Sequence, residues 1–249
     1  MLGRMGKRAA RNGWRSVVKG VSMPVSNGAP ERMRPLSDYP VVLFDFDGTV
    51  ANTQPAIYRV ASTVLRSHGY DHDDATLRLM IGPPLEEGFA LAGGMDAAEA
   101  RACADEYRAI FHDTVTPDEF PLMPGMNELL DGLVAAGKRL AVATSRMEDS
   151  ARAMARVLGL TQFEVIAGRV HGVRYSKAES IEAAIMAMRV SAHDTLMVGD
   201  RMHDVIGAAE WEIPCVGLYS GAAHPGELED AGAVATCHSV AELSELLGL

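Results

Sequence analysis

The stretch PVVLFDFDGTV at residues 40–50 decides the fold. It begins as a short, nearly continuous apolar run, which is the pattern of a strand buried on both faces. Similar runs recur at residues 140–143, 163–166, 195–198 and 215–218, with helical patterns between them. Alternating strands and helices predict an α/β protein with a doubly wound parallel sheet, whose ligand site lies at the carboxyl ends of the strands.

One stretch breaks this alternation. Residues 53–118 contain no convincing strand, but they carry apolar residues at helical spacing, with Asp96 as a candidate helix cap. We therefore predict a helical insert of roughly 65 residues that leaves the sheet within the first strand-to-helix crossover.

Carboxylates follow two of the predicted strands. Asp45 and Asp47 stand at the end of the first strand, and Asp200 and Asp204 follow the apolar run at 195–198. If these two strands are neighbours, the four side chains meet at one edge of the sheet. Several carboxylates together need a compensating cation, and all-oxygen ligands favour Mg²⁺.

Phosphate-binding groups follow at the same edge. The strand at 140–143 ends in Thr144 and Ser145, and Gly48 allows the chain to turn beside Asp47. Lys177 begins a helix that Ser176 and Glu179 open as a capping box, and a helix N-terminus favours an anion. Carboxylates, Mg²⁺, hydroxyls and a lysine together indicate phosphoryl transfer.

Four motifs follow one another along the chain: DFDGTV at 45–50, the strand that ends in Thr144, Lys177, and GDRMHD at 199–204. In this order they resemble the haloacid dehalogenase-like phosphohydrolase superfamily over about residues 39–248. The resemblance implies that Asp45 is the nucleophile that forms a phosphoaspartate and that Asp47 is the general acid/base. It assigns phosphate binding to Thr144 and Lys177, with Ser145 and Gly48 lining the site. The Mg²⁺ ligands it implies are Asp45, the Asp47 carbonyl and Asp200, supported by Asp204.

The spacing of the motifs resembles the subgroup with a helical cap after the first motif. It implies a catalytic core at 38–52 and 119–249 and a cap at 53–118. The turn at 81–85 and the segment 197–208 resemble the phosphoglycolate phosphatase and 5′-nucleotidase-like branch. The expected substrate is therefore a small phosphorylated metabolite, with phosphoglycolate or a nucleoside 5′-monophosphate as the candidates. A phosphomutase of the β-phosphoglucomutase type and a catalytically silent phosphate-binding regulatory protein are the alternatives.

Charge and composition limit the partners. The net charge is −10, yet residues 1–37 hold eight Lys/Arg and one acid, so the remainder is strongly acidic. We expect residues 1–37 to be a disordered extension or the product of an upstream start codon; an organelle-targeting peptide and a partner-binding arm are the alternatives. The acidic body disfavours nucleic-acid binding, and no apolar run is long enough to span a membrane. Three cysteines without CxxC spacing favour a reducing compartment, and we expect a cytoplasmic protein. The oligomeric state stays open.

Overall fold

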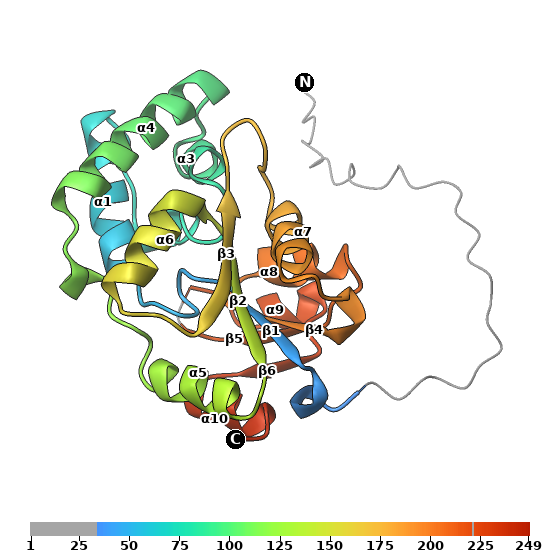
Figure 1. Cartoon of the computed structure of the whole chain (residues 1–249). Coiled ribbons are helices and arrows are strands. Elements are labelled where there is room, and N and C mark those ends of the chain that lie inside the picture. Colours follow the sequence, from blue (N-terminus) through green and yellow to red (C-terminus); the bar gives the residue numbers. More distant parts are fainter. Residues whose placement is uncertain (1–33, 221) are drawn as a thin grey trace, which may run out of the picture. The chain divides into compact units, whose positions relative to one another are not determined.

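The computed structural model describes residues 34–220 and 222–249 and has a six-stranded, all-parallel sheet at its centre (Figure 1). Its strands are β1 (Val41–Phe44), β2 (Arg139–Met147), β3 (Phe163–Arg169), β4 (Thr195–Gly199), β5 (Cys215–Leu218) and β6 (Ala235–Cys237). Their order in the sheet is β3-β2-β1-β4-β5-β6. The chain therefore runs outward from β1 on one side and then from β4 on the other, which confirms the predicted doubly wound sheet.

Helices cover both faces of the sheet. Apolar residues of α5 (Met126–Ala135), α6 (Glu148–Val157) and α10 (Val240–Leu246) pack with Val42 and Phe44 of β1 in one hydrophobic cluster. The opposite cluster joins Val41 and Leu43 to α7 (Lys177–Met188), α8 (Met202–Ala209) and α9 (Glu227–Ala231). Successive β1 side chains thus enter different clusters, as expected for a strand buried on both faces.

Four helices lie in the stretch where the sequence predicts a helical insert. They are α1 (Gln54–Ser67), α2 (Asp74–Arg78), α3 (Leu85–Gly93) and α4 (Ala97–Thr114). Asp96 caps α4 as predicted, because its side chain accepts hydrogen bonds from the backbone N–H groups of Ala98 and Glu99. These helices share a third hydrophobic cluster, which includes Leu65, Phe89 and Cys103. We call α1–α4 the helical insert; the domain boundaries at 52/53 and 118/119 stay a prediction.

The two ends of the helical insert lie side by side. The backbone N–H of Asn52 donates to the carbonyl of Pro121 at 2.8 Å, and that of Met123 donates to the carbonyl of Val50 at 2.9 Å. Ala51 and Leu122 form an antiparallel bridge between these two bonds. The helical insert therefore leaves and re-enters the sheet domain next to the loop that carries Asp45.

Some elements differ from the sequence predictions. Strand β2 continues past Ala143 to Met147, with an irregular register there, so Thr144 and Ser145 lie inside the strand and not after it. Strand β6 and helices α2, α3, α6 and α9 were not predicted. Most of the predicted extension at 1–37 lies outside the described residues; within its last part, Arg34 pairs with Asp194 at 3.2 Å. In the described part of the chain, no helix is long and apolar enough to cross a membrane.

Candidate active site

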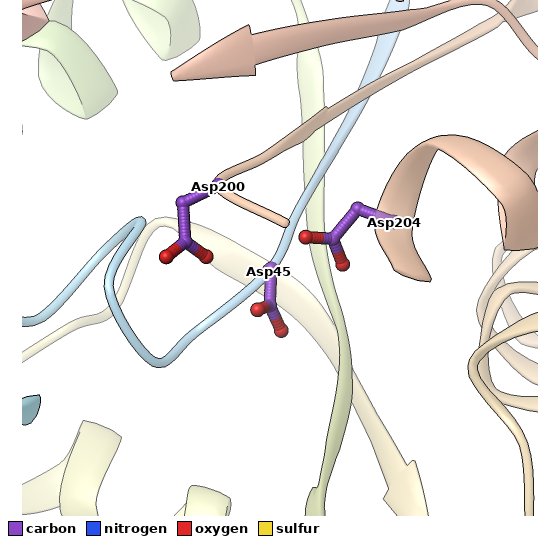
Figure 2. Close-up of side chains that lie close together, drawn as sticks. All are labelled: Asp45, Asp200 and Asp204. Atoms are coloured by element: carbon purple, nitrogen blue, oxygen red, sulfur yellow. The ribbon is translucent and has the colours of Figure 1, made fainter. Parts of the chain in front are cut away.

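Three aspartates converge at the carboxyl ends of the central strands β1 and β4 (Figure 2). Asp45 follows β1 directly, Asp200 follows β4 directly, and Asp204 comes from the first turn of α8. All three are buried, and each offers one oxygen within 4.8 Å of the others. The pairing of β1 with β4 brings together carboxylates that are about 155 residues apart in the chain, as the sequence predicts.

A single lysine joins two of these carboxylates. The Nζ atom of Lys177 lies 2.6 Å from Oδ1 of Asp45 and 2.7 Å from Oδ1 of Asp204. Lys177 is the first residue of α7, where Ser176 and Glu179 form the predicted capping box. Gly207 of α8 leaves room for it, since a Cβ there would stand 2.9 Å from Cγ of Lys177. Burial acts against the charge of Lys177, but Asp204 and Asp45 outweigh it and raise its pKa.

Among the residues that the structure describes, Asp200 has no lysine partner of this kind. The hydroxyls of Thr49 and Ser220 donate to Asp200 at 3.3 and 3.4 Å, whereas Lys177 contacts the other two carboxylates. Burial, with the negative charges of Asp204 and Asp45, raises the pKa of Asp200 well above its usual range. Burial also raises the pKa of Asp45 to about 7, opposed by Lys177. One lysine for three buried carboxylates leaves negative charge that a divalent cation would compensate, so the donor set fits Mg²⁺.

Replacing Asp200 by asparagine tests this fit. We expect Asp200→Asn to keep or raise the melting temperature of the metal-free protein, because the variant removes a buried, repelled charge. We also expect Mg²⁺ to raise the melting temperature of the wild type and to leave that of the variant nearly unchanged, since a ligand stabilises only the state that binds it. Thermal unfolding with Mg²⁺ and with EDTA measures both effects. An equal Mg²⁺ shift in both proteins would contradict the assignment.

Asp47 has a different partner. The guanidinium of Arg146 donates two hydrogen bonds to the Asp47 carboxylate, from Nε at 2.9 Å and from a terminal nitrogen at 2.6 Å. Burial alone would raise the pKa of Asp47, but Arg146 outweighs it and holds the pKa below its usual range. Arg146 also lies over the ring of Phe111 from α4, with its guanidinium carbon 4.9 Å from the ring centre. Asp47 is therefore an ionised carboxylate held between the sheet and the helical insert.

The remaining predicted residues surround this centre. Thr144 is buried, and its hydroxyl accepts a hydrogen bond from the backbone N–H of Arg146 at 3.1 Å. Ser145 and Thr144 line a cavity together with Asp45 and Asp47. Gly48 has a φ of +81°, and a Cβ there would stand 2.3 Å from Oδ2 of Asp200. Its own N–H donates to the carbonyl of Ala51 at 2.8 Å. In this structure the absence of a side chain at Gly48 therefore leaves room for Asp200, and the N–H of Gly48 stabilises the turn.

The sequence reasoning missed Arg146, Thr49 and Ser220. Arg146 stands 99 residues from Asp47, and nothing near it in the sequence marks it as the partner of a carboxylate. Thr49 belongs to the stretch at residues 40–50, where its position two residues after Asp47 was the only signal. Ser220 follows β5, so the strand-end argument that identified Asp200 could have found it too.

The cavity over these residues has a volume of about 590 Å³. Its floor contains Asp45 and Asp47, and its walls come from both the sheet domain and the helical insert. Mostly apolar side chains form these walls, including Ile57, Met80 and Leu85 of the insert. A volume of this size lies within the range of about 300–1,000 Å³ that is typical of small-molecule sites.

Two arginines tie the helical insert to the sheet domain. Arg201, next to Asp200, donates to the carbonyls of Ile81 and Arg78 in the insert, and its Nε pairs with Glu227 at 2.7 Å. On another side, Arg169 at the end of β3 pairs with Glu86 of α3 at 3.1 Å. These contacts fasten the helical insert to the sheet domain around the cavity over the carboxylates.

A family model and curated relatives match most of the chain. A family model described as "Haloacid dehalogenase-like hydrolase" matches residues 42–218. The chain is 35% identical over 212 residues to a protein of Pseudomonas aeruginosa named 5′-nucleotidase, covering 84% of this chain and 96% of that protein. It is 30% identical over 218 residues to a phosphoglycolate phosphatase of Rhodospirillum rubrum, covering 83% and 90%.

A solved structure extends the comparison. Protein Tyrosine Kinase A (PtkA) of Mycobacterium tuberculosis superimposes with a TM-score of 0.70 at 32% identity, covering 85% of this chain and 99% of that chain. The fold is thus shared with a protein whose name states a different activity from the names of the two relatives above.

Proposed function

Because the chain belongs to the haloacid dehalogenase-like hydrolase family and is a phosphatase, we propose that it hydrolyses small phosphate monoesters with Mg²⁺ through an aspartyl phosphate on Asp45. One observation carries this proposal. Asp45, Asp200 and Asp204 converge with Lys177 at the ends of β1 and β4, on the floor side of a cavity large enough for a metabolite. This is the arrangement that in-line attack by a carboxylate on a phosphoryl group requires.

The side chains of Asp45 and Asp200 and the backbone carbonyl of Asp47 would hold Mg²⁺, with Asp204 in support. When bound, the ion offsets negative charge on the phosphoryl oxygens. Lys177, which donates to Asp45 at 2.6 Å, offsets further charge. Thr144, buried at the irregular end of β2, supplies a hydroxyl to the phosphoryl group.

The reaction proceeds in two displacements at phosphorus. A carboxylate oxygen of Asp45 attacks phosphorus, the bond to the alcohol oxygen breaks, and Asp47 gives that oxygen a proton. Asp47 then takes a proton from water, which attacks the phosphoaspartate and releases inorganic phosphate. The ion pair with Arg146 holds Asp47 in the ionised state, which the second displacement needs. The first displacement needs protonated Asp47, so the ion pair must open before it.

The names of curated relatives support a class of substrate. A nucleoside 5′-monophosphate or phosphoglycolate is the candidate ester, supported by the names of the two curated relatives. The partner is thus a small phosphorylated metabolite, and we propose neither a nucleic-acid nor a membrane partner. The three cysteines at 103, 215 and 237 are free and buried, which fits a reducing compartment such as the cytoplasm.

Turnover of p-nitrophenyl phosphate tests the proposed activity. We expect the wild type to release inorganic phosphate with Mg²⁺ and to stop in excess EDTA. A panel of nucleoside monophosphates, phosphoglycolate and sugar phosphates then identifies the ester. Conversion of β-glucose 1-phosphate to glucose 6-phosphate without phosphate release would show a mutase instead. Phosphate transfer from ATP to tyrosine would show a kinase, and binding without turnover would show a silent protein.

Asp47→Asn tests the role of Asp47 in proton transfer. We expect kcat/KM for an alkyl phosphate, which reports the first displacement only, to fall by about 10²–10⁴-fold, because the amide cannot give the leaving oxygen a proton. The decrease should be much smaller for p-nitrophenyl phosphate, whose leaving group needs no proton. Steady-state kinetics on both esters measures the difference. Equal losses on the two esters would show that Asp47 does not act on the leaving group.

A further inference from the structure

The cavity over Asp45 is a slot between two helices. Helix α4 and the residue after it contribute Tyr107, Arg108, Phe111, His112 and Val115 to the lining. Helix α6 contributes Asp149, Ser150, Ala153, Met154 and Val157. Both sets follow the spacing i, i+1, i+4, i+5, i+8, which is a single helix face over two turns. At 1.5 Å per residue, each face extends along the slot for about 12 Å.

The slot runs from the reacting carboxylate to the surface. Asp45 at its floor is 4% exposed, whereas Val157 at its other end is 58% exposed. A phosphoryl group that Asp45 attacks lies at the closed end, so the alcohol to which it is bonded must extend toward the open end. The walls of the slot therefore contact the leaving group.

The chemistry of the walls changes along this path. Polar groups gather at the first turn of α6, near the floor, where Arg146 donates to the hydroxyl of Ser150 at 3.2 Å and Asp149 lies beside it. Further along α6 the lining residues are Ala153, Met154 and Val157, which are all apolar.

An aromatic pair of α4 also lines the cavity, and one of its rings, Phe111, lies over the guanidinium of Arg146. The rings of Tyr107 and Phe111 are stacked, with centres 5.6 Å apart and planes 27° apart. Both residues line the cavity. A flat aromatic group of a ligand gains free energy by stacking on such side chains.

We propose that the leaving alcohol is a nucleoside-sized molecule whose hydroxyl-bearing part lies at Ser150 and Asp149 and whose planar part lies between α4 and α6. This inference rests on the proposed phosphatase function and chooses between its two candidate esters. Glycolate would occupy only the closed end and leave the apolar walls without a partner. The sequence of phosphate, hydroxyl-bearing sugar and flat base matches the order of charged, polar and apolar groups along the slot.

Filling the slot tests the proposal. Ala153 is exposed on α6 and lines the slot, so Ala153→Trp places a large ring in it without disturbing the core. We expect kcat/KM for adenosine and uridine 5′-monophosphates to fall by roughly tenfold or more, the equivalent of losing one good contact. The value for phosphoglycolate should change by less than about threefold, since a short ester stays at the floor. In the wild type, the nucleotides should be the better substrates.

Arg152→Trp is the matched control, because Arg152 is an exposed neighbour on α6 that does not line the slot, and its ion pair among the described residues is with half-buried Glu148. This variant should behave as wild type toward both esters. Equal losses on nucleotides and phosphoglycolate in Ala153→Trp, or a wild-type preference for phosphoglycolate, would overturn the proposal.

Binding of the nucleoside alone separates this proposal from the phosphatase function. Titration calorimetry with adenosine and uridine should show binding to the wild type and to Arg152→Trp, and a Kd at least about tenfold weaker for Ala153→Trp. This readout needs no turnover. Absence of hydrolysis with intact, Ala153-sensitive nucleoside binding would reject the phosphatase function and keep the slot. Hydrolysis without nucleoside binding would reject the slot and keep the phosphatase.

Discussion

Asp45→Asn should remove turnover while the protein stays folded. The amide is nearly isosteric with the carboxylate, but it cannot form the phosphoaspartate, so kcat should fall by roughly 10⁴-fold or more. The fold should survive because burial already disfavours the charge of Asp45 and raises its pKa to about 7. Lys177 also keeps its second partner, Asp204, at 2.7 Å.

Three measurements check this expectation: phosphate release on the preferred ester, circular dichroism, and acid-quenched mass spectrometry for the phosphoenzyme. Asp118→Asn, at an exposed carboxylate outside the cavity, is the control for the substitution itself. A normally folded Asp45→Asn protein with more than a few per cent of wild-type activity would refute Asp45 as the nucleophile.

Lys177→Met should have the largest effect on stability. The Lys177 side chain is 5% exposed and supplies the positive charge between Asp45 and Asp204. Removing one partner of a buried ion pair leaves the other uncompensated and typically costs about 3–5 kcal/mol in the free energy of unfolding. Activity should fall too, because Lys177 donates to the carboxylate that attacks phosphorus.

The pH dependence of this loss identifies its cause. Without Lys177 the buried carboxylates have pKa values above those of the unfolded chain, so the folded state binds more protons and its stability falls as pH rises from about 4 toward 8. The stability deficit of Lys177→Met relative to wild type should therefore be larger at pH 8 than at pH 5. Chemical denaturation at both pH values measures it. A deficit independent of pH would mean that Lys177 contributes through packing and not through charge.

The sequence was sufficient to predict the parts of the site that follow apolar strands. Asp45 and Asp200 each come directly after a continuous apolar run, and parallel neighbours end at the same edge. Lys177 was predicted from the capping box that begins with Ser176, a local pattern with a fixed geometry. Their roles in catalysis stay predictions until the variants are measured.

Elements without such local patterns were missed. Strand β6 is only three residues, Ala235–Cys237, and has no apolar run. Helix α3 contains Gly88, a residue type that lowers the expectation of a helix in the sequence. In the structure a Cβ at Gly88 would stand 3.3 Å from the backbone of Met80, so close packing between α3 and the preceding turn explains that glycine.

Long-range pairs were missed for a different reason. The contact between Arg146 and Asp47 joins residues 99 positions apart and depends on how β2 ends. Neither residue's neighbours in the sequence contain a signal for the other. The apolar slot was missed likewise, because it exists only where α4 of the helical insert meets α6.

The paired ends of the helical insert affect how the chain folds. Val41 of β1 pairs with Arg139 of β2, so nearly a hundred residues must be synthesised before the central strands can meet. The entropic cost of closing such a loop rises by only about 0.6 kcal/mol for each doubling of its length. The bonds from Asn52 to Pro121 and from Met123 to Val50 close the intervening segment on itself. Once they form, β1 and β2 are joined by a short effective connection, and the insert can lengthen or shorten during evolution at little cost to assembly of the sheet.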